Sequence, residues 1–139
     1  MTFEDWEADV PAEIKADTLW RVKAYRLALF LSDLAWSDTE RLHHRQRSAH
    51  HADQLCRAAS KISSCISEGY SRDTGKARST YYEYAAGSAR ETRDWYYKLR
   101  RLLPVAVVAH RIDLTTQIVR LALKMIATER RSNRRASDT

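Results

Sequence analysis

Glycine and proline are scarce in this chain, which has three glycines and two prolines among 139 residues. Sheet proteins use both residues in their turns, so this scarcity argues against a sheet and favours one all-helical domain. No run approaches the eighteen or more consecutive apolar residues of a membrane-spanning helix. The N-terminus also lacks the basic and then apolar pattern of a secretory signal. We therefore expect an all-α protein of the cytoplasm.

Motifs for catalysis and cofactor binding are also missing. The sequence has no glycine-rich phosphate loop, no nucleophile elbow and no zinc signature. Cys56 and Cys65 are nine residues apart, which on one helix places them on opposite sides and about 13 Å apart along the axis. They cannot form a disulfide within that helix. We expect reduced thiols packed as small side chains, no enzymatic activity and no cofactor.

Four histidines fall close together, as the pairs His43 and His44 and His50 and His51. On a helix, the spacing of seven residues would bring His43 to a similar side as His50, and His44 to a similar side as His51. Zinc usually needs three or four convergent ligands, whereas adjacent histidines diverge on a helix. A metal site is one hypothesis; we expect instead a solvated linker or helix start that becomes more positive at acid pH.

Charge is unevenly distributed along the chain. Residues 1–17 hold six acids and one base, so the remainder carries 23 bases against 12 acids, a net charge of +11. Such a field attracts polyanions such as RNA or DNA, or an acidic protein surface, although it can also serve solubility alone. Because neither end has a sustained apolar period, we expect a flexible or loosely docked acidic arm over residues 1–16 and a basic disordered tail over residues 130–139.

Apolar periodicity between these ends, over residues 17–129, predicts an up-down-up-down four-helix bundle. The expected helices cover about residues 17–36, 54–72, 76–103 and 108–129. A helix of a monomeric bundle needs only one buried face, so a second apolar stripe predicts a subunit contact. The first helix has such a stripe at Val22, Tyr25, Leu29 and Trp36, and the last helix has one that includes Val119 and Leu123.

The second expected helix, QLCRAASKISSCISEGYSR, is strongly amphipathic. Its apolar arc consists of Leu55, Ala59, Ile62, Ile66 and Gly69. The opposite arc carries Arg57, Lys61 and Glu68, and we expect it to contact a neighbouring subunit. We interpret Glu68 as a partner of bases at the surface or at a subunit interface, because a catalytic carboxylate would need a partner and a pocket.

The third expected helix has a basic and aromatic side. Its core side is predicted from Tyr81, Tyr84, Ser88, Trp95, Leu99 and Leu102. The far side is predicted to bind nucleic acid, because arginine with interleaved tyrosine can hold phosphates and stack on bases. That surface consists of Arg90, Arg93, Tyr97, Arg100 and Arg101. The alternative is a solvated face paired with Glu83 and Asp94. Gly87 in mid-helix predicts close approach by a neighbouring helix.

The second helix and the segment AAGSARET at residues 85–92 carry a family resemblance. The chain resembles the bacterial four-helix bundle family first noticed as proteins encoded in intervening sequences of 23S ribosomal RNA genes. The resemblance covers about residues 19–126, and Ser63 and Cys65 stand where that family has proline and asparagine. The matching residues include Gln54, Arg57, Ala58, Ala59, Ile62, Ser64, Ile66, Glu68, Gly69, Tyr70, Arg72, Ala85, Gly87, Ser88 and Glu91.

This resemblance implies a ring-like homopentamer and a function. A related branch, the accessory variability proteins of diversity-generating retroelements, consists of basic pentamers that bind nucleic acid and a reverse transcriptase. The resemblance implies a non-enzymatic, oligomeric accessory protein that binds nucleic acid. It would contact the phosphate backbone of RNA or DNA, and a reverse transcriptase is its candidate partner. The alternative is an oligomeric scaffold that binds proteins and has no affinity for nucleic acid.

Overall fold

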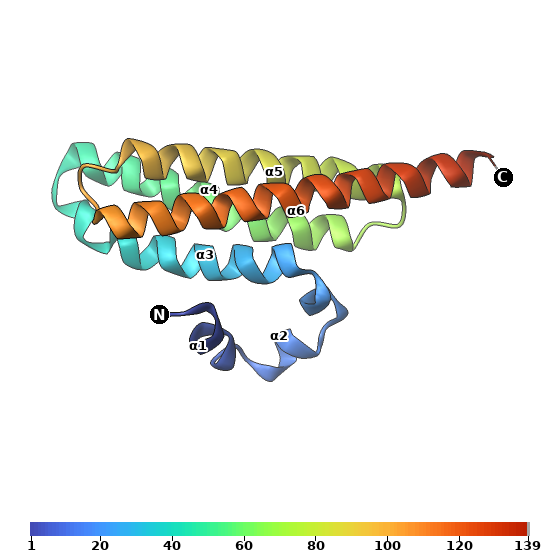
Figure 1. The fold of residues 1–139 in the computed structure, drawn as a ribbon, viewed down its shortest axis with the longest axis horizontal. Helices are drawn as coiled ribbons and strands as arrows, with labels where there is room; N and C mark the ends of the chain where they lie inside the picture. The colour runs from blue at the N-terminus through green and yellow to red at the C-terminus, as the bar shows by residue number, and fades with distance from the viewer. Residues whose placement is uncertain (139) are drawn as a thin grey trace.

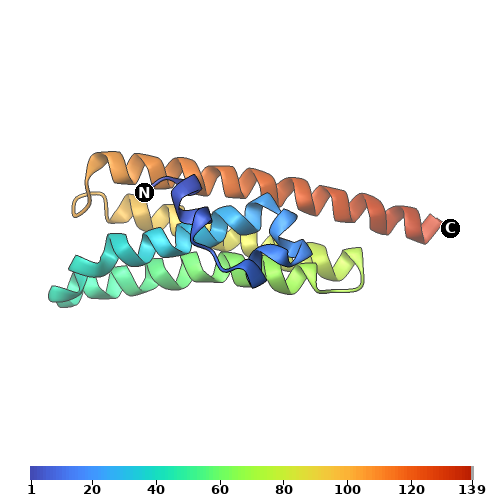
Figure 2. The same ribbon diagram turned by 90° about the horizontal axis from the view of Figure 1, so that it is seen from below.

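The computed structural model describes residues 1–138, and the all-helical prediction is confirmed (Figure 1). Four long helices pack lengthwise side by side and alternate in direction along the chain, and two short α-helices precede them (Figures 1 and 2). The elements are α1 Phe3–Ala8, α2 Ala12–Ala16, η1 Thr18–Arg21, α3 Lys23–Thr39, η2 Glu40–His44, α4 Gln46–Tyr70, α5 Gly75–Lys98 and α6 Val105–Asp138.

Local signals explain where several elements begin. The Asp17 side chain accepts a hydrogen bond from the amide of Leu19 at 2.9 Å and so caps η1. The Thr74 hydroxyl accepts from the amide of Ala77 at 3.1 Å and caps α5, as its position in the sequence predicts. Pro104 directly precedes α6, where its missing N–H breaks no helical hydrogen bond. These three starts follow from local chemistry, whereas α3 and α4 begin without a side-chain cap.

The apolar arc of α4 forms the centre of the core as predicted. Leu55, Ala59, Ile62 and Ile66 are all fully buried. Gly69 continues this arc at a close contact, because an added Cβ would lie 2.7 Å from the ring of Tyr82 on α5. Both cysteines of this helix are free, and burial raises the pKa of each thiol.

The core side of α5 is rotated from the predicted one. Ser88 and Leu99 are buried as expected, but Tyr84 is 54% exposed and Leu102 is 49% exposed. Tyr81 and Trp95 are only partly buried. The tyrosines that enter the core are instead Tyr82 and Tyr96. The buried side consists of Ser79, Tyr82, Ala85, Ala86, Ser88, Ala89, Thr92 and Tyr96. Small alanines let α5 approach its neighbours closely, so they rather than the largest side chains define this face.

Gly87 lies on the outside of α5. An added Cβ would meet nothing within 4 Å. The close neighbouring helix that this glycine predicts is therefore not supplied by residues 1–138 of the same chain.

The acidic arm is docked, which is one of the two expected alternatives, and it is helical, which is not expected. It lies against α3 (Figures 1 and 2), where Trp6 is only 8% exposed. The Trp6 ring stacks on Trp20 and tilts against Phe30, and its Nε1 donates to Asp33 at 2.7 Å. The arm thus covers apolar surface of α3.

This docking changes the interpretation of the second apolar stripe of α3. Val22, Tyr25 and Leu29 are partly buried against the core of their own chain. They therefore do not require a second subunit to cover them. Trp36, the fourth member of the stripe, remains 72% exposed.

The basic tail is helical through Asp138, where the sequence predicts disorder from residue 130; Thr139 lies outside the described residues. Contacts with α5 support this extension, since Arg78 Nε lies 3.0 Å from Glu129 Oε2 and Arg130 pairs with Glu83. In the same helix, Val119 is buried in the core, which corrects its prediction as an interface residue, whereas Leu123 is 44% exposed.

No helix within residues 1–138 combines the length and apolar character that crossing a membrane requires.

Candidate nucleic-acid interface

The predicted arginine and tyrosine surface is divided in the structure. Arg90, Arg93 and Tyr97 lie on α5, but Arg100 and Arg101 follow its last residue and belong to the turn before α6. Arg93 is partly buried and its Nη1 donates to Thr116 Oγ1 on α6 at 3.1 Å. The five residues therefore do not form one continuous helical face.

Arg100 and Tyr97 form a compact pair at the end of α5. The guanidinium carbon of Arg100 lies 4.1 Å from the centre of the Tyr97 ring. Arg100 Nη1 also donates to the Tyr97 carbonyl oxygen at 3.0 Å. Because the tyrosine is 54% exposed, the stacked pair presents both a cation and an aromatic surface to solvent.

A basic hollow lies at this same end of the molecule. The start of α4 and the turn between α5 and α6 meet there, at the left end of Figure 1. The hollow has a volume of about 300 Å³, and its lining contains four cationic side chains, one histidine and no acid. We call it the basic end hollow; it is lined by Arg45, Arg47, Ser48, His51, Lys98, Leu99, Arg101 and Leu102.

Hydrogen bonds at the start of α4 hold one wall of the basic end hollow. The Ser48 hydroxyl lies 2.7 Å from the carbonyl oxygen of Leu42 in η2 and 3.2 Å from that of Arg45. His51 Nδ1 lies 2.9 Å from the Arg47 carbonyl oxygen, and its ring stands edge-on to Trp95 at 5.3 Å. These contacts fix the backbone that carries both arginines.

The cations of the basic end hollow differ in how far they are neutralised. Lys98 Nζ lies 2.7 Å from a carboxylate oxygen of Asp94 and 4.6 Å from the centre of the Trp95 ring. Arg45, Arg47 and Arg101 are exposed and pair with no carboxylate among residues 1–136. Three arginines from two separate segments are therefore available to an anion.

A buried ionic network ties three helices together beside the hollow. Arg111 on α6 contacts Asp38 on α3 through two nitrogens, at 2.8 Å and 3.0 Å. The Tyr96 hydroxyl on α5 donates to the same carboxylate at 2.7 Å. Burial, and then the charge of Asp38, raise the pKa of Tyr96 far above its ordinary value, so it remains a hydrogen-bond donor. The network fixes the end of α5 from which the hollow's turn departs.

The other predicted site residues lie apart from this end or lack convergent partners. Lys61 and Glu68 are exposed on α4, and Arg57 is exposed nearer its start. His43 Nδ1 lies 3.7 Å from Asp53, but no three metal-ligating side chains converge anywhere in the described chain. The surface character of Arg57, Lys61 and Glu68 agrees with the sequence pattern.

The comparison with family models shows which family the chain belongs to. The model of the 23S rRNA-intervening sequence protein family matches residues 21–126, which is most of the chain. The chain belongs to this family. The match includes the basic end hollow and all four long helices, but not the acidic arm or the last part of α6. No curated protein matches the chain significantly.

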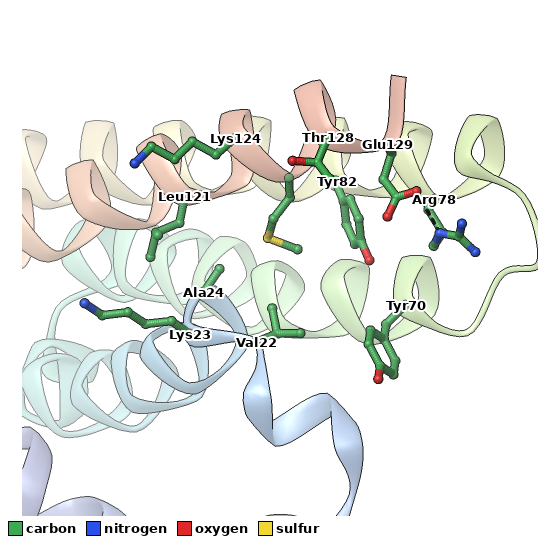
Figure 3. Close-up of a pocket in the computed structure, with 11 residues that line it drawn as sticks. Val22, Lys23, Ala24, Tyr70, Arg78, Tyr82, Leu121, Lys124, Thr128 and Glu129 are labelled. Carbon is green, nitrogen blue, oxygen red and sulfur yellow. Dashed lines mark hydrogen bonds and ion pairs between the residues drawn. The ribbon is translucent and has the colours of Figure 1, made fainter. Parts of the chain in front are cut away.

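This member of the family has a further pocket that its sequence does not predict. The pocket has a volume of about 510 Å³ and forms where the start of α3, the end of α4 and both later helices meet (Figure 3). Its walls are largely apolar, and Arg78 pairs with Glu129 at one end (Figure 3). Burial, and then the charge of Glu129, raise the pKa of Tyr82 to about 12. Lys23 and Lys124 also line this pocket, but it differs from the basic end hollow because its lining includes an acid, Glu129.

Proposed function

We propose that this member of the 23S rRNA-intervening sequence protein family is a non-enzymatic accessory protein that binds nucleic acid through the basic end hollow. The observation that carries the proposal is the convergence of Arg45, Arg47, Lys98 and Arg101 around one hollow without a lining acid. Arginine binds phosphate with two parallel hydrogen bonds, and the hollow is open enough to admit a backbone. The stacked Arg100 and Tyr97 extend this surface.

Recognition by such a surface is directed at phosphates and is therefore sensitive to salt. Each neutralised phosphate adds about 0.7 to 0.9 to the slope of log affinity against log salt concentration. Replacing Arg45, Arg47 and Arg101 with glutamine should reduce that slope by about 2 to 3. The measurement is fluorescence anisotropy of labelled RNA and DNA over a salt series.

A matched control separates the hollow from the general charge of the body. Arg21, Arg120 and Arg134 are exposed and lie outside the hollow. Their replacement with glutamine removes the same three charges and should leave most of the slope intact. Equal losses in both triple variants would show that the hollow has no special role. Absence of binding by the unaltered protein at about 50 mM salt would refute nucleic-acid binding altogether.

Self-association is the second part of the proposal. We propose that the four long helices act as an up-down-up-down bundle that assembles into the ring-like homopentamer implied by the resemblance. Exposed Tyr84 and Leu123, and the open space above Gly87, support a contact with another copy. Sedimentation giving a monomer mass at micromolar concentration would refute it.

A reverse transcriptase as partner, and action in the cytoplasm, rest on the resemblance and on the sequence pattern alone. The alternative function is an oligomeric scaffold without affinity for nucleic acid, which the same exposed aromatic and apolar residues favour. Capture of one dominant protein that persists after nuclease treatment, together with no measurable binding of RNA or DNA, would support the scaffold.

A further inference from the structure

Trp36 is the one tryptophan of the chain that lies largely in solvent. It is 72% exposed, whereas Trp6 is 8% exposed and Trp20 and Trp95 are partly buried. The acidic arm accounts for the rest of its apolar stripe on α3, but it leaves this ring uncovered. A single exposed ring does not by itself require a partner, so the case for a site rests on the groups that surround it.

The ring borders a second hollow, of about 550 Å³, between the end of α3 and the first half of α4. Its lining brings together acceptors and donors, in contrast to the basic end hollow. The polar side chains of its lining include Glu40, Asp53, Gln54 and Arg57. We call this site the Trp36 hollow.

The floor of the Trp36 hollow is fixed by a buried contact between the two helices. Thr39 is 1% exposed, and its hydroxyl lies 2.8 Å from the Ala35 carbonyl oxygen and 3.1 Å from Cys56 Sγ. The hollow therefore has a preformed base, with the ring on one side and polar groups on the other.

These groups match the chemistry of an unpaired nucleobase better than that of a phosphate. A base can stack on an indole, and its amino groups can donate to carboxylates such as Glu40 and Asp53. The same two carboxylates would repel a phosphate, so the backbone must lie elsewhere. The basic end hollow is close along α4, because consecutive residues His50 and His51 line the two hollows in turn.

We propose that the Trp36 hollow binds one unpaired base of a single strand whose phosphates lie in the basic end hollow. This inference rests on the proposed nucleic-acid binding and specifies its ligand as single-stranded RNA or DNA. Because Glu40 and Asp53 accept hydrogen bonds, bases that carry an amino group bind better than uracil. In a duplex the faces and pairing edges of the bases are occupied, so the Trp36 hollow contributes nothing there.

The experiment uses the full chain and labelled oligonucleotides of about 20 nucleotides, long enough to span both hollows. Oligo(C), oligo(U) and a mixed duplex are compared by anisotropy for the unaltered protein, Trp36→Ala, Trp36→Phe and the control Tyr70→Ala, an exposed ring outside both hollows. Loss of one stacked base should weaken oligo(C) binding about 5- to 150-fold in Trp36→Ala. Trp36→Phe should keep most of the affinity, and neither Tyr70→Ala nor the duplex should show the loss.

Two further measurements test the same site. Asp53→Asn and Glu40→Gln should each reduce the preference for oligo(C) over oligo(U). Bound oligo(C) should also protect tryptophan fluorescence from acrylamide, because Trp36 is the most exposed tryptophan. Trp95 lies against His51 and Lys98 of the basic end hollow, so the same protection is measured on Trp36→Phe. Protection that is lost in Trp36→Phe belongs to Trp36, and this comparison decides the matter even if Trp36→Ala does not fold.

The outcomes separate this inference from the proposed function. No binding of any oligonucleotide at low salt overturns both. Salt-dependent binding that Trp36→Ala leaves unchanged, without acrylamide protection, overturns the base site alone. Equal weakening of single strand and duplex, or a lower sedimentation mass for Trp36→Ala, overturns it in favour of a subunit contact at Trp36.

Discussion

Removing the carboxylate of Asp38 should destabilise the protein strongly. The side chains of Asp38 and Arg111 are only 9% and 12% exposed, and two hydrogen bonds join them. Asp38→Ala leaves the buried guanidinium without its counter-charge and the Tyr96 hydroxyl without its acceptor. Breaking a buried pair from one side costs about 3 to 5 kcal/mol, a large part of the 5 to 15 kcal/mol typical of whole domains.

The assay is urea unfolding followed by circular dichroism, with a thermal scan alongside. A loss of this size lowers the melting temperature by about 10 to 15 °C for a chain of this length. Tyr96→Phe removes one hydrogen bond to a charged acceptor and should cost about 1.5 to 3 kcal/mol. The double variant Asp38→Ala with Arg111→Met should be less destabilised than the sum of the single variants, because it leaves no unpaired charge.

A second consequence links the network to the basic end hollow. Since Asp38 and Tyr96 hold the end of α5, Asp38→Ala should also weaken salt-dependent RNA binding below its melting temperature. A loss of stability under about 1 kcal/mol would contradict the reasoning, because it would place the pair among surface ion pairs. Additive single and double variants would contradict it as well.

Three further predictions concern α4 and α5. Gly69→Ala should destabilise the protein by about 1 to 3 kcal/mol in urea unfolding, since the new Cβ would crowd the Tyr82 ring; an unchanged midpoint would show that the helices move apart freely. Gly87→Ala should instead stabilise the isolated chain by about 0.5 to 1 kcal/mol. If another copy packs there, the same variant should lower the sedimentation mass. A destabilised monomer would contradict the conclusion that the space above Gly87 is open. The Tyr82 pKa of about 12 exceeds the ordinary tyrosine value of 10.0, so the contribution of Tyr82 to stability is complete below pH 10 and is lost as pH rises towards about 12. Unfolding at pH 9 and pH 11 should show a smaller alkaline loss in Tyr82→Phe, and equal losses would show that its phenol titrates normally.

The sequence predicts the buried face of α4 well because its apolar and charged residues separate with the helical period. Leu55, Ile62 and Ile66 face one way, and charged residues face the other. On α5 the same reasoning fails, because large aromatics occur on both sides of the helix. Tyr82 and Tyr96 enter the core where alanines allow close packing, and Tyr84 stays outside. Only the positions of the neighbouring helices decide between such rings.

The candidate site was only partly predictable. Arg101 is recognised from the sequence as basic, but a helix drawn through to residue 103 places it on the wrong surface, since α5 ends at Lys98. Nothing in its local pattern connects it to Arg45 and Arg47, more than fifty residues earlier. That proximity follows from antiparallel packing of α4 and α5, which brings the start of one beside the end of the other. Likewise, the acidic arm lacks an apolar period that would predict docking, and Trp6 can be placed only once Trp20 and Phe30 are known to lie together.

The docked arm also sets a threshold for association through α3. It lies outside the region shared with the family, yet it occupies apolar surface beside Phe30 in every copy of the chain. A tethered segment of this kind competes at an effective concentration on the order of millimolar. Any partner for that surface must displace it, so shortening the arm would convert a weak or latent contact into a strong one without altering a single residue of the four long helices.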